Sequence, residues 1–312
     1  MWISNSCYGE MDPPLPQDML NQMYANDSWY IAKMPRFERL LSEPRIMISV
    51  LSYTLVFQFL SYLTRRFLWH RAEGFRQYRL RNITICFIHS TFCGLFVLYF
   101  ALTRFQFMVN NPVFYNEKWM PEILLFSIGY FIHDAIHMLK FELSRWTIEL
   151  LIHHIITASV LMIAFVSDFF ISFAYWSLLM ELNSVFLHMR TLFQLSNASK
   201  TRPDLFTAIQ HGNIITCAFE KTLELIIVIS GFVVFRFISP AIQLQYVFNH
   251  RHNFRLFYLI VSFGSGVVFF VINVFLFIRI LASDGYLGEY GRKHTAIGRD
   301  KQTDQKANGK TD

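Results

Sequence analysis

Histidines and a carboxylate recur at helical spacing inside two apolar stretches of the chain. The first stretch holds His133, Asp134 and His137, and the second holds the tandem pair His153 and His154. A histidine beside a carboxylate can act as a general base toward an amine or hydroxyl, or as a nucleophile toward an activated acyl group. Both roles suit acyl transfer within a membrane, so the candidate catalytic residues are His133, Asp134, His153 and His154.

Further polar residues of the apolar stretches share helical faces with these groups. Glu149 precedes His153 by four residues and Glu181 precedes His188 by seven, so each pair lies on one face of a helix. A carboxylate one turn from a histidine can orient the ring and raise its basicity. A charge at the centre of a bilayer costs about 2.5–3.5 kcal/mol, which predicts that such groups face a shared interior. The residues expected to line an interior cavity are His89, His137, Glu149, Glu181 and His188.

Two other interpretations of these residues stay open. The histidines and carboxylates could hydrogen-bond across helices and simply hold the bundle together. The H-x-x-x-H spacing of His133 and His137 could also contribute to a metal site. Membrane di-iron enzymes, however, carry repeated H-x-x-H-H boxes, which this sequence lacks. We therefore expect no metal and no other bound cofactor.

The composition places these residues in a membrane protein. Of 312 residues, 54% are hydrophobic and only 16% are charged, which is less charge than a soluble domain of this length carries. A helix needs about 20 apolar residues to cross ~30 Å of hydrocarbon. Seven stretches approach this length, at residues 46–63, 83–102, 120–139, 148–166, 169–189, 214–235 and 256–281. The sequence predicts an all-α, polytopic membrane protein of about seven transmembrane helices, the fifth of which is polar enough to face other helices.

The basic residues predict the orientation of these helices. They cluster beside the apolar stretches, so the net charge of +6 indicates membrane topology and no nucleic-acid partner. Six arginines lie between residues 64 and 82, and the loops after the third and fifth stretches are also basic. This bias predicts an N-terminus outside and a C-terminus in the cytosol. The sequon at Asn26 then lies outside and is a candidate glycosylation site.

Three motifs, in this order on consecutive predicted helices, resemble the TLC (TRAM–LAG–CLN) domain. They are GYFIHD at 129–134, HHIIT at 153–157 and ELNSVFLHMR at 181–190. FVVFRFISP at 232–240 and RILASD at 279–284 extend the resemblance to about residues 75–285. The expected organisation is a polar N-terminal segment (1–45), a first helix with its basic loop (46–74), a TLC domain (75–283) and a disordered basic tail (284–312).

The resemblance also implies a fold and a site. The family fold is a barrel of six helices, here the second to the seventh, around a lipid-accessible tunnel, with the first helix outside. Ceramide synthases share the domain, and their catalytic paired histidines correspond to His153 and His154. Thr157 completes the H-H-x-x-T pattern of the family and is expected to line the cavity. Many relatives carry an acid where this chain has His137.

Within the family, the chain is most similar to metazoan proteins that regulate membrane phospholipid composition and fluidity. This similarity implies a plasma-membrane protein that limits incorporation of long-chain polyunsaturated fatty acids into phospholipids, with the endoplasmic reticulum as the alternative location. One alternative function is acyl transfer from acyl-CoA through His153 and His154, with acyl-CoA as a substrate. Another is a lipid-binding or trafficking adaptor. Membrane lipids and fatty acyl chains are the expected partners.

Overall fold

Six long helices of the computed structural model are apolar enough to cross a membrane. The structure describes residues 30–31, 33–110, 112–141, 145–197 and 228–283. Within these ranges the candidate spans are Pro44–Leu68, Gly74–Thr103, Met120–Phe141, Thr147–Ser167, Val228–Asn249 and Leu256–Ala282. These helices confirm the predicted all-α, polytopic membrane fold.

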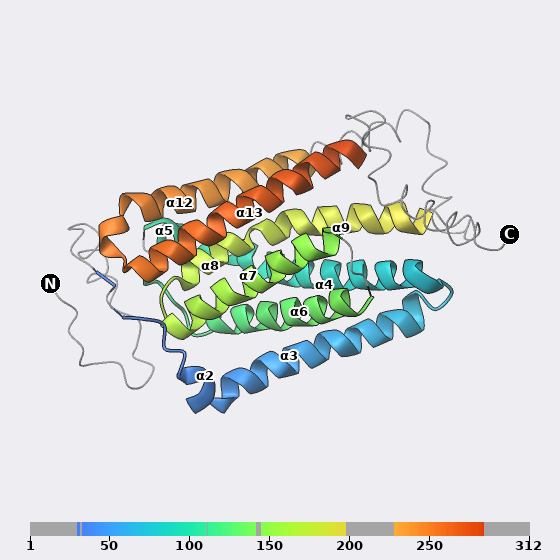
Figure 1. Cartoon of the computed structure of the whole chain (residues 1–312), viewed down its shortest axis with the longest axis horizontal. Helices are drawn as coiled ribbons and strands as arrows, with labels where there is room; N and C mark the ends of the chain where they lie inside the picture. The colour runs from blue at the N-terminus through green and yellow to red at the C-terminus, as the bar shows by residue number, and fades with distance from the viewer. Residues whose placement is uncertain (1–29, 32, 111, 142–144, 198–227, 284–312) are drawn as a thin grey trace.

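The helices run back and forth along a single elongated bundle (Figure 1). α3 packs on α6, α6 on α7, and α4 on α9. A single isolated β-bridge, between Ile31 and Phe254, occurs in the described parts of the chain. In chain order the elements are α2 (Arg39–Ser42), α3 (Pro44–Leu63), the π-helical turn η1 (Thr64–Leu68), α4 (Gly74–Thr103), α5 (Phe105–Asn110), α6 (Met120–Phe141), α7 (Arg145–Ser167), α8 (Ile171–Leu178), α9 (Met180–Asn197), the π-helical turn η2 (Val233–Ile238), α12 (Ser239–Asn249), the 3-10 turn η3 (Arg251–Asn253) and α13 (Leu256–Ser283).

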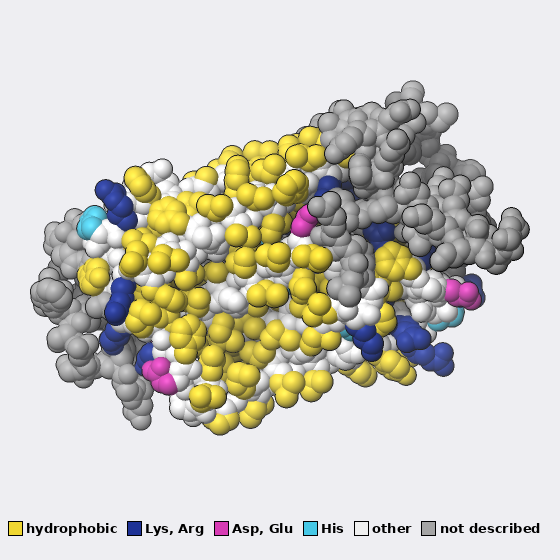
Figure 2. Space-filling view, in the orientation of Figure 1, with side chains coloured by type: hydrophobic (Ala, Val, Ile, Leu, Met, Phe, Trp, Pro, Cys, Tyr) yellow, Lys and Arg dark blue, Asp and Glu magenta, His cyan; other side chains and the backbone are white. Residues whose placement is uncertain are grey.

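The surface of the bundle is apolar around its middle and charged toward its ends. Figure 2 shows hydrophobic side chains across the central part of this face, with Lys and Arg nearer the two ends. Ile48, Ile260 and Val267 are 61%, 63% and 63% exposed although each lies within a candidate span. Water disfavours so broad an apolar surface whereas hydrocarbon tolerates it, so this surface fits a bundle embedded in a bilayer.

The fifth predicted helix corresponds to two successive helices, α8 and α9. Only Leu179 separates them, and its own backbone angles are right-handed helical, while the left-handed backbone of Phe170 (φ 67°) precedes α8. Neither helix qualifies as a candidate span, yet together they follow the length of the bundle (Figure 1). Glu181, Asn183 and Ser184 of α9 are buried, which confirms that this polar element faces other helices.

The candidate span that corresponds to the sixth predicted helix extends further along the chain than the sequence predicted. The predicted helix covered residues 214–235, of which 214–227 lie outside the described residues, whereas the candidate span is Val228–Asn249. Pro240, Gln243 and Gln245 lie beyond the predicted end at residue 235 and interrupt the apolar sequence there. Pro240 is accommodated because it lies in the first turn of α12, where a missing backbone N–H removes no helical hydrogen bond.

The interior of the bundle is centred on α6. In the apolar window of α6, 67% of the residues are buried, compared with 6% for α13, so α13 lies at the periphery. α3 approaches α6 closely, since a Cβ at Gly129 would lie 2.6 Å from Cβ of Tyr53. Phe57 of α3 is fully buried, and its ring centroid lies 5.0 Å from that of Phe126 and 5.4 Å from that of Tyr130.

The segment before α2 is attached to the end of the bundle where α13 begins. The backbone N–H of Ile31 donates to the carbonyl of Asn253 at 2.9 Å. The hydroxyl of Tyr258 donates to the carbonyl of Lys33 at 3.0 Å. Ile31 is buried in one hydrophobic cluster with Tyr258 and Val247, so this segment belongs to the packed structure.

An ionic contact also fixes α2 beside the end of α7. Arg36 and Arg39 both donate to the carboxylate of Asp168, whose backbone is left-handed (φ 57°). Arg39 donates a further hydrogen bond to Glu43 at 2.8 Å, and this bond lowers the pKa of Glu43. The turn after α7 is therefore held by two guanidinium groups from the N-terminal side.

Candidate functional site

Most of the chemistry-bearing residues predicted from the sequence are buried in the bundle. They project from four helices, α4, α6, α7 and α9, and none of them faces the bilayer. The buried members of the predicted set are His89, His133, Asp134, His137, His153, His154 and Glu181. Thr157 and His188 are half-buried. A polar interior shared by several helices, as the sequence predicted, is therefore present.

His154 of α7 lies beside the carboxylate of Asp134 on α6. Nε2 of His154 is 3.4 Å from Oδ2 of Asp134, and both side chains are almost fully buried. The aromatic rings of Phe131 and Tyr130 flank the imidazole, with centroid distances of 5.2 Å and 6.2 Å. A carboxylate at this position can orient the imidazole and select its tautomer. The pair is the arrangement that general acid–base chemistry requires of a histidine and its partner.

His89 and Ser90 of α4 lie against Glu181 of α9. The Ser90 hydroxyl donates to Oε2 of Glu181 at 2.5 Å, and Nδ1 of His89 lies 3.9 Å from the same oxygen. The His89 ring stacks on Tyr130 with a centroid distance of 3.8 Å. Because Tyr130 also contacts the ring of the second tandem histidine, these groups form one continuous interior. Its four titratable members, termed the polar seam, are His89, Asp134, His154 and Glu181.

His133 and His137 lie on the flank of α6 that faces α3. Nε2 of His137 is 2.9 Å from Oε1 of Gln58, and the two imidazole centroids are 4.3 Å apart. The His133 centroid lies 6.2 Å from that of Phe57. The structure thus separates His133, a predicted catalytic residue, from the tandem histidines and places it with α3.

Glu149 is oriented toward α13. Its carboxylate accepts a hydrogen bond from Arg279, and its side chain is 40% exposed. The sequence placed Glu149 beside His153 because the two share a helical face. The structure instead pairs Glu149 with a residue 130 positions later in the chain, since α13 brings a guanidinium to this part of α7.

His153 lies on the side of α7 that faces α13 and lines a small pocket. The pocket encloses about 20 Å³ and is also lined by Thr157, Glu181 and Phe269. The ring centroid of Phe269 lies 5.3 Å from that of His153. The Thr157 hydroxyl donates to the backbone carbonyl of His153 at 2.8 Å. The two tandem histidines therefore lie in different environments, because His154 contacts α6 and His153 faces α13.

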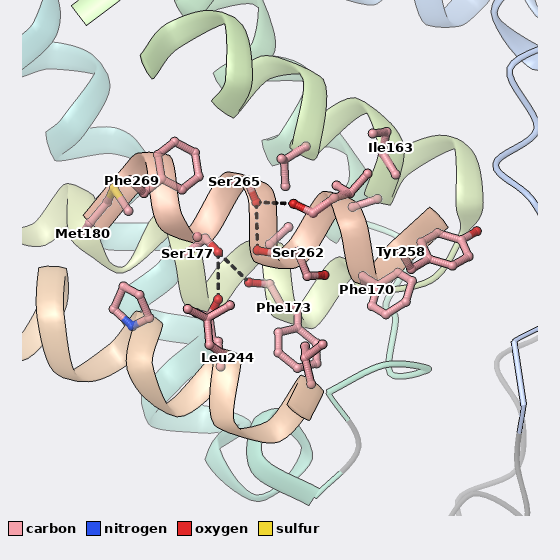
Figure 3. A pocket seen from close by; sticks show the side chains of 18 residues that line it. Ile163, Phe170, Phe173, Ser177, Met180, Leu244, Tyr258, Ser262, Ser265 and Phe269 are labelled. Atoms are coloured by element: carbon pink, nitrogen blue, oxygen red, sulfur yellow. Dashed lines mark hydrogen bonds between the residues drawn. The ribbon is translucent and has the colours of Figure 1, made fainter. Parts of the chain in front are cut away.

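A larger apolar cavity of about 120 Å³ adjoins this pocket. Residues of α7, α8, α12 and α13 line it, and Figure 3 shows Phe173, Tyr258 and Leu244 around the space. Its hydroxyl groups are largely satisfied by nearby partners. Ser177 donates to Oε1 of Gln243 at 3.0 Å, for example. The cavity thus offers mainly hydrocarbon contacts to whatever enters it.

The cavity and the small pocket share part of their walls. The residues that line both spaces are Val160, Ser177, Met180 and Phe269. An imidazole and a carboxylate, those of His153 and Glu181, therefore lie at one end of an apolar volume. This arrangement suits an amphipathic ligand, with its hydrocarbon tail in the cavity and its polar group beside His153.

Arg236 is a buried charged residue that the sequence analysis did not single out as part of the site. Its guanidinium donates to Oδ1 of Asn183 at 3.1 Å, to Oδ1 of Asn273 at 3.1 Å and to Oγ of Ser184 at 2.8 Å. Phe232 packs under the guanidinium at 5.3 Å. The signal was present in FVVFRFISP, because an arginine within an apolar run requires buried partners. Those partners come from α9 and α13, which spacing alone could not identify.

Two other sequence predictions concern residues or groups outside this geometry. Asn26, the candidate glycosylation site, lies outside the described residues. In the described ranges, no three His, Cys, Asp or Glu side chains come together in a way that could hold a metal ion. The described cysteines, Cys86 and Cys93, are buried free thiols.

Residues 79–282 are the part of the chain that matches a known family. This range, which includes the polar seam, the small pocket and Arg236, matches the TLC domain. The chain belongs to the TLC domain family. The resemblance found in the three sequence motifs is thereby confirmed, and family membership supports a membrane lipid-related role.

Similar proteins carry the same domain name in several vertebrates. TLC domain-containing protein 2 of Mus musculus is 38% identical over 117 residues, which cover 38% of this chain and 37% of that protein. TLC domain-containing protein 2 of Homo sapiens is 28% identical over 205 residues, or 65% of this chain and 70% of that protein. TLC domain-containing protein 1 of Gallus gallus is 29% identical over 145 residues, 46% of this chain and 56% of that protein. No solved structure matches the chain.

Proposed function

We propose that this protein regulates the acyl composition and fluidity of membrane phospholipids, limiting the incorporation of long-chain polyunsaturated fatty acids. The observation that carries the proposal is the apolar cavity that adjoins a polar pocket at His153 and Glu181. A fatty acyl chain has the same two-part chemistry, with a hydrocarbon tail and a polar carbonyl end. Membership of a lipid-related membrane family supports this assignment.

Acyl transfer is the second candidate function, and the position of the tandem histidines favours it. His153 lines the pocket where the acyl carbonyl would lie, while His154 is held by Asp134 at 3.4 Å. As a base, His153 would take the proton from an acceptor N–H or O–H. The acceptor atom would bond to the acyl carbon, the carbon–sulfur bond of acyl-CoA would break, and coenzyme A would leave as the thiol with that proton.

The experiment replaces both tandem histidines with alanine and profiles phospholipid acyl chains in cells that express either protein. A matched control replaces Ile155 and Ser159, which lie on the exposed face of the same helix. Loss of the effect on polyunsaturated chains in the histidine variant alone is the expected result. Equal surface expression and membrane location of both variants are required for the comparison.

The same cells separate the remaining possibilities. An unchanged acyl profile in the histidine variant would contradict chemistry at the pair. It would point instead to a lipid-binding or trafficking adaptor, whose protein partner should still be recovered with the double variant. Conversion of labelled acyl-CoA and a lipid acceptor to product by the purified wild-type protein would establish the acyltransferase.

We propose a plasma-membrane location with the N-terminus outside, and the endoplasmic reticulum as the alternative. The arginines of residues 64–82 support this orientation, because basic loops remain on the cytosolic side. Surface labelling of an N-terminal tag in intact cells tests both points. A glycosidase-sensitive mass shift that disappears in Asn26→Gln would support an outside N-terminus, and labelling of a C-terminal tag alone would contradict it.

A further inference from the structure

A second group of nitrogen atoms lies toward the C-terminal end of α6, on the flank that faces α3, and all of its members except the exposed Lys140 are buried. It gathers around the ring of Phe141, where the end of α6 meets the beginning of α4 (Figure 1). Cζ of Arg81 lies 5.2 Å from the centroid of this ring, and Nζ of Lys140 lies 5.3 Å from it. The His137 centroid is 5.7 Å away, and His133 stacks beside His137.

Three of these nitrogens lack a hydrogen-bond partner among the described residues, and Nδ1 of His137 is one of them. Nε of Arg81 and Nε2 of His133 have none among the described residues, although the two residues are only 8% and 2% exposed. No described carboxylate forms an ion pair with Arg81. The other ring nitrogen of His137, Nε2, is occupied by Gln58. A buried guanidinium that has no counter-charge among the described residues is costly, and a bound anion would remove that cost.

Exposed arginines connect this buried group to the surface. Arg65, Arg66 and Arg71 are exposed on η1 and the loop that follows it. Arg65 is close enough to act electrostatically on Arg81, and Arg81 in turn acts on both imidazoles of His133 and His137. Figure 2 shows Lys and Arg side chains gathered toward this end of the molecule. Positive charge is thus continuous from the rim to the buried donors, and it would attract an anion.

We propose that Arg81 and His133 bind a phosphate group of a membrane-associated ligand. Phosphate suits the site because it offers several acceptor oxygens and enough negative charge to balance a buried guanidinium. A phospholipid head group and the phosphates of acyl-CoA share this chemistry. The proposal does not rest on the tandem histidines, whose pocket opens toward α13.

The test measures ligand affinity of the full-length protein in a phosphate-free detergent. The probes are phosphatidic acid and oleoyl-CoA, each compared with its phosphate-free counterpart, diacylglycerol with the same chains and oleate. The wild type is expected to bind at least one phosphate-bearing probe roughly tenfold more tightly than its counterpart. The probe that shows this preference identifies the source of the phosphate. Arg81→Gln is expected to remove the preference and leave the affinity for the counterpart unchanged.

Controls separate binding from folding and from the proposed function. Arg255→Gln makes the same charge change at an exposed position directly before α13, away from η1, and should keep the preference. The double alanine variant of His153 and His154 should also keep it, even where the acyl profile is lost. Equal binding of every probe and its counterpart by the wild type would overturn the proposal whether or not Arg81→Gln folds. An equal loss of affinity for both members of a pair in a folded Arg81→Gln would overturn it too.

Discussion

The polar seam and the apolar cavity are neighbouring regions of one bundle with opposite construction. In the seam, four titratable groups are buried and packed directly against aromatic rings, such as that of Tyr130. In the cavity, about 120 Å³ stays open between apolar walls from α7, α8, α12 and α13. The small pocket lies between them, because Glu181 of the seam lines it together with His153, which is next in sequence to His154 of the seam.

The two regions suit different tasks: the seam orients polar groups, and the cavity accommodates an apolar ligand. In the seam, aromatic rings packed directly against the imidazoles restrict the orientation of these polar groups. An open apolar volume cannot orient a ligand, but it accommodates chains of different length or shape. The tandem histidines stand at the boundary, so a ligand that is loosely held in the cavity meets a rigid polar end.

The largest expected effect comes from filling the space that the apolar cavity and the small pocket share. Val160 lines both the cavity and the small pocket. In Val160→Trp the indole should fill this shared space and abolish the effect on polyunsaturated acyl chains, while the unfolding temperature stays unchanged. Acyl-chain profiling and thermal unfolding measure the two outcomes. Ile155→Trp is the matched control, because Ile155 lies on the same helix and is 55% exposed. A normal lipid profile in Val160→Trp would mean that no ligand passes between the two spaces.

The second-largest effect concerns the buried guanidinium of Arg236, which donates hydrogen bonds to residues of both α9 and α13. Arg236→Met should lower the free energy of unfolding by about 3 kcal/mol, because Asn183, Ser184 and Asn273 lose their donor. Arg236→Lys should lose less, since an ammonium keeps the charge but cannot reproduce the planar geometry. Denaturant unfolding in detergent measures both. Equal stability of the Met variant and the wild type would show that these contacts are not stabilising.

A pair of phenylalanine truncations compares the packing of the two regions. Phe57 is fully buried and contacts His89 and Tyr130 of the seam region, whereas Phe173 lines the cavity. Phe57→Ala should be more destabilising than Phe173→Ala by about 2 kcal/mol, because new empty space costs most where the surroundings are closely packed. Unfolding free energies of the two variants give the comparison directly. Equal losses of unfolding free energy in the two variants would contradict the proposed difference in packing between the seam and the cavity.

The smallest effect is a pH dependence in the loop that precedes α6. Burial raises the pKa of Glu117, but hydrogen bonds from Tyr115, Arg104 and Trp119 outweigh it, so the net pKa is lowered from 4.5. A lowered carboxyl pKa contributes stability above the ordinary value, and this contribution is lost as the pH falls below 4.5. Glu117→Gln should therefore cost less than about 1 kcal/mol near neutral pH and nothing in acid. Unfolding measured across this pH range tests the sign, and a cost that grows in acid would refute it.

Much of the fold could be predicted because apolar length alone reports a membrane helix. The predicted third helix, 120–139, corresponds to Met120–Phe141, and the fourth, 148–166, corresponds to Thr147–Ser167. The predicted helix bounds were least accurate where polar residues lie within a helix and face the interior of the bundle instead of marking the end of the helix. Gln243, for example, accepts a hydrogen bond from Ser177 beside the cavity, although it lies beyond residue 235, the predicted end of the sixth helix.

The site was predictable only within single helices. Helical spacing correctly identifies which residues share a face, but it does not identify the neighbouring helix. Glu149 shares a face with His153 and nevertheless meets Arg279. Arg236 donates to Asn273, which lies 37 residues later in the chain. This contact forms only because η2 packs against α13. The roles assigned to the tandem histidines and to Asp134 stay predictions until the variants above are measured.

The contact between Tyr258 and the segment before α2 couples two parts of the molecule mechanically. Tyr258 forms part of the cavity wall, and its hydroxyl holds the carbonyl of Lys33. Ile31 adds a backbone hydrogen bond to Asn253 a few residues away. The segment before α2 is therefore bonded directly to one residue of the cavity wall and to the turn before α13, so Tyr258 cannot be displaced without moving this segment or breaking its bond to Lys33.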